Sequence, residues 1–519
     1  MIAETPGYQS VRAYGHAMPI ISGRRNDAPS ARRRSRLVAA SLAPLALVLG
    51  PAGSAVADPP DYTLTVGIPT GESPAATIDN RLASGGGQVL TEQLLGLGDP
   101  TDYSHSRFGA AMLVQDLDVD GFDDLVVGAP STPHPGLQRA LGSVYLLFGT
   151  STGISAARAV TLPVPSEVQD GDEFGAALSL TFRTTEDDST SEFRDLWIGA
   201  PGHDVAGRSD AGAVYRYTLS SAGVPAFVEA ITQDSPLLPG AAEAGDRFGE
   251  VLAASAGNAL IVGVPHEDVG RAQDAGIVQQ LRIDPVSYAL IAGSGWSQNN
   301  AGVAGTAEAG DRFGASMTEN AAVVGVPGED LGRLQDAGAV QLFTVTPKSW
   351  LAPSSTYNQD SRGIPGVAEA GDRFGAAVQI GAYQCESDTV AVGAPGEDIG
   401  SAKNAGSVTL APPLSSDVTR KDCPATMFSQ GHGLPGAAET GDELGIALGE
   451  LPGDVNDEES MRDVLLAGIP GEDVGTTATG RDVGRVVVGI GGISRPGRGY
   501  GFQRGDVENL RYGSYFPSR

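Results

Sequence analysis

Two short motifs repeat along most of the chain, and this repetition constrains the fold more than any other feature. Phe-Gly recurs at intervals of 61 to 74 residues, beginning at Phe108, Phe174, Phe248, Phe313 and Phe374, with Leu444-Gly445 as a variant. A Gly-x-Pro tripeptide follows each of them, beginning at Gly128, Gly199, Gly263, Gly325, Gly393 and Gly468. Four short apolar segments per repeat are typical of a propeller blade, whereas solenoid repeats are shorter. The sequence therefore predicts an all-β propeller of four-stranded antiparallel blades.

The two ends of the chain carry parts of one more repeat. A seventh Gly-x-Pro, Gly67–Pro69, has no Phe-Gly before it, and Tyr512-Gly513 near the C-terminus has no Gly-x-Pro after it. We expect seven blades, of which the last is shared between the termini. Its outer strands would lie at Tyr62–Pro69 and around Gln88–Leu95, within residues 62–97, and its inner strand at residues 510–516. Such closure removes the open edges of a row of sheets.

The first repeat contains an acidic loop with the pattern D-x-D-x-D-G-x-x-D. Calcium prefers six to eight oxygen ligands, and alternate residues of a tight loop can converge on one point. We therefore predict a Ca²⁺ site with five ligands: the side chains of Asp116, Asp118, Asp120 and Asp124, and the carbonyl of Phe122. The absence of Cys and His in the loop disfavours zinc. The alternative is a solvated acidic turn.

Phe-Gly, the acidic loop and Gly-Ala-Pro together resemble the FG-GAP repeats of the integrin alpha-subunit N-terminal propeller. The resemblance covers roughly residues 62–516, and the Asp116–Pro130 block carries its most specific part. The family places calcium ligands at the same motif positions, and integrins bind partners on the opposite face. The resemblance therefore implies a protein-binding or cell-adhesion-like module.

Blade six contains a weaker acidic segment, which gives a second metal candidate. It has carboxylate and amide groups at Asp454, Asn456 and Asp463, but no Gly at the turn. The spacing of a working cation loop is broken there, so a solvated turn is the competing interpretation.

Acidic residues also recur in the loops that should emerge opposite the cation loop. The Glu-Asp pairs that follow Gly-x-Pro are a candidate partner face: Glu267, Asp268, Glu329, Asp330, Glu397, Asp398, Glu472 and Asp473. The Ala-Glu-x-Gly-Asp loops add Asp246, Asp311, Asp372 and Asp442, among others. The competing interpretation is structural: each Asp caps a turn and pairs with the Arg of Asp-Arg-Phe-Gly.

The formal net charge of −29 restricts the partners. Such a surface disfavours nucleic acid and anionic membranes and favours cations or a basic protein or glycan ligand. We expect residues 58–519 to form one propeller domain and residues 1–57 to be an export signal and leader. The leader has a basic stretch at 32–36, an apolar run at 37–49 and an A-x-A cleavage site ending at Ala57. The apolar run is short for a membrane span. We therefore expect a secreted or cell-surface protein whose mature chain has no transmembrane segment. The alternative is a retained N-terminal anchor.

Export is compatible with a disulfide. Cys385 and Cys423 are the two cysteines of the chain, and they fall in loops of blade five that should emerge on one face, so we predict that they pair.

The sequence contains no recognised catalytic motif, and we expect no enzymatic activity. The alternatives are a propeller-based hydrolase of a lipid or glycan, since FG-GAP propellers also occur attached to hydrolases resembling the glycosylphosphatidylinositol phospholipase D family, and a carbohydrate-binding lectin. His266 replaces the Gly of other repeats, and we interpret it as a loop substitution rather than a catalytic base.

Overall fold

The computed structural model describes residues 38–40, 90, 92–97, 464–471 and 485–490. Between residues 106 and 451 it describes all but gaps at 133–140, 151–152, 185–189, 256–258, 285, 319–322, 347–350, 382, 384–388, 412–422 and 435. The chain divides into two compact units, residues 1–35 and residues 36–519, and every described residue lies in the second unit.

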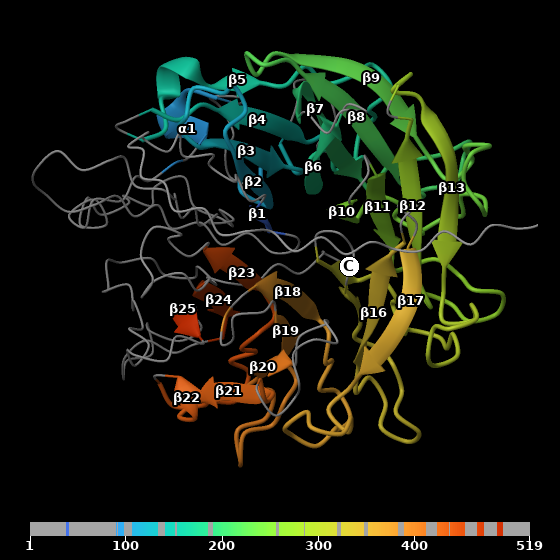
Figure 1. Ribbon diagram of the computed structural model, residues 1–519, viewed down its shortest axis with the longest axis vertical. Coiled ribbons are helices and arrows are strands. Elements are labelled where there is room, and N and C mark those ends of the chain that lie inside the picture. The colour runs from blue at the N-terminus through green and yellow to red at the C-terminus, as the bar shows by residue number, and fades with distance from the viewer. Residues whose placement is uncertain are drawn as a thin grey trace, which may run out of the picture. The chain divides into compact units, whose positions relative to one another are not determined.

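The described part of the second unit is built from antiparallel sheets that follow one another in chain order (Figure 1). The first contains β1 (Val38–Ala40), β2 (Ala111–Gln115), β3 (Asp124–Ala129), β4 (Ser143–Leu147) and β5 (Val160–Thr161). The second contains β6 (Ala177–Thr184), β7 (Thr190–Ala200), β8 (Ala213–Leu219) and β9 (Pro225–Ile231). The third contains β10 (Val251–Ser255), β11 (Ala259–Val264), β12 (Ile277–Ile283) and β13 (Leu290–Trp296).

The remaining sheets continue the series. The fourth contains β14 (Ser316–Met317), β15 (Val323–Val326), β16 (Ala339–Val345) and β17 (Leu351–Tyr357). The fifth contains β18 (Ala377–Gly381), β19 (Thr389–Ala394), β20 (Ser407–Ala411), β21 (Thr426–Gln430) and the short β22 (Gly433–Leu434), which is parallel to β21. The sixth contains β23 (Leu448–Leu451), β24 (Val464–Ile469) and β25 (Arg485–Ile490). The first strand after each Phe-Gly contacts the corresponding strand of the next sheet, which is the arrangement of a β-propeller.

The repeated motifs are the points where consecutive blades meet. A Cβ atom on Gly128 would lie 2.0 Å from the carbonyl oxygen of Gly175, the Gly of the next blade's Phe-Gly, and the same approach recurs at Gly199, Gly263, Gly325 and Gly393. The aromatic side chain of each Phe-Gly from Phe174 to Phe374 is fully buried. Its backbone bridges to the preceding blade in parallel fashion, as in Gly142↔Phe174. Both motifs therefore recur because backbone contact between blades leaves no room for larger residues at the glycines.

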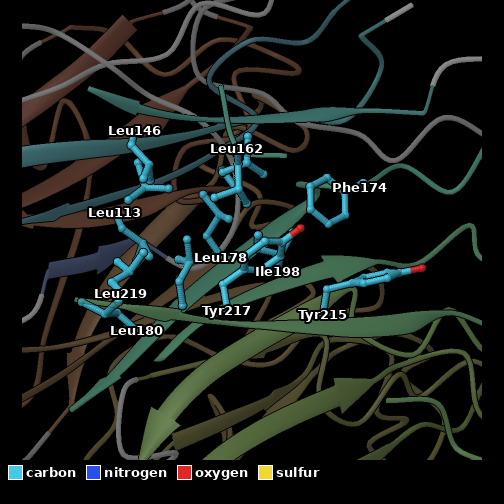
Figure 2. Packing of buried hydrophobic residues seen from close by; sticks show 14 of the residues in the cluster. Leu113, Leu146, Leu162, Phe174, Leu178, Leu180, Ile198, Tyr215, Tyr217 and Leu219 are labelled. Atoms are coloured by element: carbon cyan, nitrogen blue, oxygen red, sulfur yellow. The ribbon is translucent and has the colours of Figure 1, made fainter. Parts of the chain in front are cut away.

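The hydrophobic core lies between neighbouring blades. Figure 2 shows Leu113 and Leu146 of the first sheet packed with Leu178 and Ile198 of the second. Similar clusters join the third sheet to the fourth and the fifth to the sixth. Burial of each such side chain contributes about 1.5–3 kcal/mol, so the inter-blade seams stabilise the propeller.

One inter-blade seam also contains a buried ion pair. Arg216 of β8 is 1% exposed. It donates to Asp195 of β7 at 2.8 Å, to Glu229 at 3.1 Å and to the carbonyl of Tyr288 in the next sheet at 2.9 Å.

The expectation of seven four-stranded blades is corrected in part. Within the described residues, five sheets have four or more strands and a sixth has three. Most of the segments assigned to a shared seventh blade, including residues 62–69 and 510–516, lie outside the described residues.

The strand expected around Gln88–Leu95 is wrong, because residues Glu92–Leu95 form the helix α1. Glu92 turns inward there and accepts a 2.6 Å hydrogen bond from Tyr145 of β4, while Leu95 packs in the same cluster as Tyr145. Glu92–Leu95 therefore form a single helical turn that buries Glu92 and Leu95 beside Tyr145, and they do not pair as a strand.

Val38–Ala40, which fall within the predicted leader, form β1 antiparallel to β2. The rest of the leader lies outside the described residues, and its cleavage stays a prediction.

Candidate metal centre

The acidic loop connects β2 to β3 of the first sheet and brings three of its carboxylates together. Ligand atoms of Asp116, Asp118 and Asp120 all lie within 4.8 Å of one another. Val119 and Gly121 adopt positive φ angles of 60° and 91°, which fold the loop tightly enough for alternate side chains to face one point.

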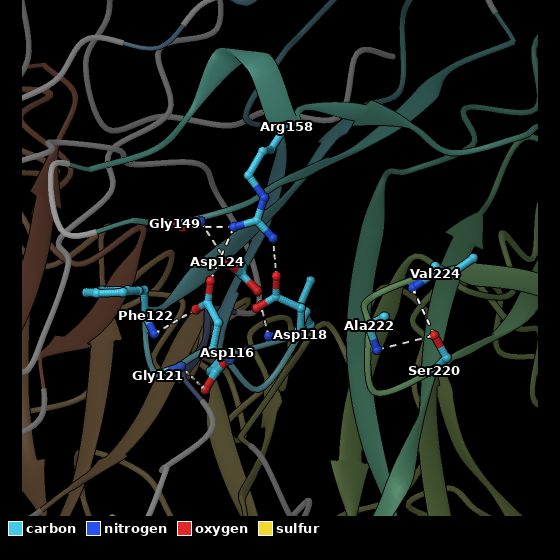
Figure 3. Close-up of polar contacts among 12 residues, drawn as sticks. Asp116, Asp118, Gly121, Phe122, Asp124, Gly149, Arg158, Ser220, Ala222 and Val224 are labelled. Atoms are coloured by element: carbon cyan, nitrogen blue, oxygen red, sulfur yellow. Dashed lines mark hydrogen bonds and ion pairs between the residues drawn. The ribbon is translucent and has the colours of Figure 1, made fainter.

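Hydrogen bonds within the loop fix two of these carboxylates (Figure 3). Asp116 accepts from the backbone N–H groups of Asp120 and Gly121, both at 3.1 Å. Asp120 accepts from the N–H of Phe122 at 3.0 Å. These hydrogen bonds hold the two carboxylates in place within the loop.

Asp118 provides the observation that points most directly to a cation. Its Oδ1 atom is buried and has no hydrogen-bond partner in the part of the chain that the structure describes. A buried carboxylate oxygen without a donor costs free energy, and coordination of a cation would satisfy it. The donor set, which consists of oxygen atoms alone, fits calcium.

Asp124 lies apart from this cluster. Its two oxygens accept 2.7 Å hydrogen bonds from the N–H groups of Leu117 and Gly149. Burial raises its pKa to about 7, and the neighbouring carboxylates add to this effect. Asp124 therefore shapes the loop in this structure, and its predicted role as a metal ligand, like that of the Phe122 carbonyl, stays a prediction.

Two arginines approach the acidic loop from outside it. Arg158, at the end of the short helix η2 (Ala156–Arg158), pairs with Asp118 and with Asp120, the latter at 3.2 Å (Figure 3). Its guanidinium also lies over the Phe148 ring. Arg194 of β7 donates to the carbonyl of Leu117 at 3.0 Å. No motif in the sequence marks either arginine, since only the folded hairpins bring them to the loop.

The second metal candidate, which comprises Asp454, Asn456 and Asp463, lies outside the described residues. It stays a prediction.

In the loops of the candidate partner face and in the loops before Phe-Gly, most of the described aspartates have a structural role. Asp268, Asp330 and Asp398 each accept a backbone hydrogen bond of 2.9–3.0 Å from the residue six positions later. The aspartates before Phe-Gly cap the turn that begins three residues earlier: Asp172, Asp246, Asp311, Asp372 and Asp442. Glu472 and Asp473 lie outside the described residues.

The expected pairing of these aspartates with the arginines of Asp-Arg-Phe-Gly is not what the structure contains. Arg247 pairs instead with Glu173 and Glu250, both at 2.7 Å, and Arg373 pairs with Glu443 at 3.4 Å. The residues before Phe-Gly have positive φ angles, and in adjacent blades they are close enough to pair with each other.

The three described glutamates of the candidate face are partly or fully buried and receive side-chain donors. Gln233 donates to Glu267 at 2.7 Å, and Gln298 and Gln359 donate to Glu329 and Glu397. Burial raises the pKa of each glutamate to about 7. The signal that could have revealed this contact is the Gln that recurs two residues after an outer strand.

The other sequence-derived candidates are placed as follows. Cys423 is fully buried in the connection between β20 and β21. Cys385 lies outside the described residues, so the disulfide stays a prediction. His266 lies 2.9 Å from Asp274 and 3.7 Å from Glu250, a setting that orders its loop.

Fold and site together define the class of protein. A family model described as FG-GAP repeat matches residues 108–147, a range that spans the first Phe-Gly, the acidic loop and β4. The chain therefore contains an FG-GAP repeat at residues 108–147 within a β-propeller fold, which supports the predicted resemblance to integrin alpha propellers.

Several characterised proteins share part of this sequence. Phosphatidylinositol-glycan-specific phospholipase D of Bos taurus is 34% identical over 128 residues, which is 23% of this chain and 14% of that protein. Integrin alpha ina-1 of Caenorhabditis elegans is 33% identical over 115 residues, 22% of this chain and 10% of that protein. Integrin alpha-V of Gallus gallus is 33% identical over 106 residues, which is 20% of this chain and 9% of that protein. The chain therefore spans only a small fraction of the length of these relatives.

The described residues contain no helix that is long and apolar enough to cross a membrane.

Proposed function

We propose that this protein is an exported, calcium-binding β-propeller that acts as a protein-binding or adhesion-like module. The convergence of Asp116, Asp118 and Asp120, with a buried Asp118 oxygen that lacks a donor among the described residues, carries the calcium assignment. Similarity to integrin alpha chains supports the binding role.

The metal would brace the junction between the first two blades. The loop joins β2 to β3, and Arg194 of the second sheet donates to its Leu117 carbonyl. A ligand that binds only the folded state stabilises it by about 2.7 kcal/mol at 100 times its Kd. Calcium would therefore raise the thermal stability of the whole propeller.

Melting curves of the full chain with and without calcium test this proposal. We expect calcium to raise the Tm of the wild type and of Glu167→Gln, which neutralises an exposed acid in the connection between the first two sheets. The same calcium should raise the Tm of Asp118→Asn less than it raises the Tm of the wild type. An equal rise for all three proteins would show that calcium does not act at the loop.

The partner that fits the acidic loops of the opposite face is a basic protein or glycan ligand. The net charge of −29 favours such a ligand. Asp268→Asn/Asp330→Asn retains the capping oxygens and removes two charges from the face. We expect it to bind a lysine-rich peptide more weakly than Glu167→Gln/Asp284→Asn, the control with two acids neutralised elsewhere. Equal affinities would contradict the assignment of this face.

A lipid hydrolase is the second candidate, and the similarity to phosphatidylinositol-glycan-specific phospholipase D favours it. Release of a glycosylphosphatidylinositol-anchored protein from vesicles by the purified chain would support this activity. Loss of release on His266→Ala would assign a role to His266, and no release by the wild type would remove this candidate.

A further inference from the structure

Three consecutive blade junctions contain the same set of buried polar side chains. The first member is a Gln that lies two residues after the outer strand of one sheet. The second is a Glu in the next sheet, separated from the Gly-x-Pro motif by one residue, which is His or Gly. The third is the Asp that precedes Arg-Phe-Gly in that same sheet. The three sets are Gln233, Glu267 and Asp246; Gln298, Glu329 and Asp311; and Gln359, Glu397 and Asp372. None of them belongs to the acidic loop of the first blade.

The Gln and Asp side chains are removed from water, while Glu267 and Glu329 are half-buried. The glutamines are 0%, 4% and 2% exposed, and each of the three aspartates is 1% exposed. Each Gln donates through Nε2 to the Glu of its own set, at 2.7 Å for Gln233 and Glu267. The carboxamide of each Gln is therefore in direct contact with the carboxylate of its Glu.

The junctions contain more acceptor oxygens than donors. The Oε1 atoms of Gln233, Gln298 and Gln359 are buried and have no hydrogen-bond partner among the described residues. Asp372 Oδ1 is also buried and also has no hydrogen-bond partner among the described residues. Buried acceptors without donors are costly, and their recurrence at three junctions indicates a missing positive group at each.

The second blade shows how close the two acidic positions lie. There His203 occupies the position of the Glu, and its Nδ1 lies 2.6 Å from Oδ2 of Asp172, the corresponding Asp. Pro163, two residues after β5, stands where the later junctions have Gln. At this junction the imidazole of His203 supplies the positive or donating group, and both the Glu and the Gln of the later junctions are absent.

We propose that each of these three junctions binds a divalent cation, with calcium as the fitting metal, through the Glu and Asp carboxylates and the Gln carbonyl oxygen. Two carboxylates balance the charge of one divalent ion, and an all-oxygen donor set suits calcium. Further acids surround the sites, such as Glu369 and Asp398 near Glu397, while Lys403 pairs with Asp398 at the surface. The bound ions would tie the outer edge of one blade to the loops of the next.

The electrostatics of the junctions agree with this geometry. Burial, together with the nearby carboxylates, raises the pKa of each Glu to about 7 and that of each Asp to about 6. A bound cation would relieve both effects.

The test uses calorimetric calcium titration of the full chain carrying Asp116→Asn and Asp120→Asn, so that the loop of the first blade no longer contributes. We expect calcium binding to persist in this background. Glu397→His should remove one equivalent of bound calcium, and the protein should stay folded because the new imidazole can pair with Asp372 as His203 pairs with Asp172. Glu369→Gln, which neutralises an exposed acid in the loop that contains Asp372, is the matched control and should leave the stoichiometry unchanged.

Glu329→His makes the same change at a different junction and keeps the proposal testable if Glu397→His is poorly folded. Absence of calcium binding in the Asp116→Asn/Asp120→Asn background, or unchanged stoichiometry in a folded His variant, would overturn the proposal. So would stabilisation by acid alone with no response to calcium, since a proton would then fill the role assigned to the metal. None of these results would affect the assignment of the acidic loop, which the background variant isolates.

Discussion

Replacement of Gly199 by Ala should show how strongly the Gly-x-Pro motif holds two blades together. A Cβ atom at this position would lie 2.0 Å from the carbonyl oxygen of Gly249 in the next blade. Ordinary carbon–oxygen contact requires a separation that is larger by about 1 Å or more. Both partners are backbone, so no side chain can rotate to make room, and the two blades must move apart.

Overpacking of this kind costs about 1–3 kcal/mol, and occasionally more. The clash at Gly199 is severe and opens a seam that contains Trp197 and Phe248, so we expect a loss of about 3 kcal/mol in the free energy of unfolding. Gly449→Ala is the matched control, because a Cβ there would meet its nearest neighbour at 3.7 Å. Urea unfolding followed by tryptophan fluorescence would measure both variants. If Gly199→Ala proved as stable as Gly449→Ala, close backbone contact would not explain why the motif recurs.

Three further predictions concern buried groups. Asp195→Ala should cost about 3–5 kcal/mol because it removes the buried carboxylate partner of Arg216, whereas Glu229→Ala, which removes the more exposed partner of the same arginine, should cost about 1 kcal/mol or less in urea unfolding; equal costs would contradict this account. Burial raises the pKa of Glu92 in the folded protein. The protonated Glu92 side chain therefore contributes fully to stability below the ordinary Glu pKa of about 4.3, and this contribution is lost as the pH rises through the raised pKa. Glu92→Gln should flatten that part of the stability–pH curve, and an unchanged curve would argue against it. Non-reducing electrophoresis and thiol titration should find Cys385 and Cys423 paired, with a contribution of about 2–4 kcal/mol, and two free thiols would exclude the pair.

Repetition made the fold predictable. Phe-Gly and Gly-x-Pro mark inter-blade backbone contacts that leave no room for a side chain at the glycines, so the spacing of the motifs indicates the order of the described sheets. The helix at Glu92–Leu95 was missed because its stabilising contacts, the hydrogen bond from Tyr145 to Glu92 and the packing of Leu95, involve residues far away in the sequence.

The candidate site was predictable to the extent that it is local. Asp116, Asp118 and Asp120 are adjacent in the chain, and their alternation alone brings them together. Asp124 matches the motif but also faces two backbone donors that only the folded hairpins place beside it. Pairing between the residues before Phe-Gly also depends on contacts between blades, which a single repeat does not reveal.

The central claim, that the acidic loop of the first blade binds calcium, is tested most directly by calorimetric titration of the full chain beside its Asp116→Ala and Asp120→Ala variants. The account predicts that each variant lacks one high-affinity site that the wild type has. A wild type that binds no calcium, or variants that bind as much calcium as the wild type, would contradict it.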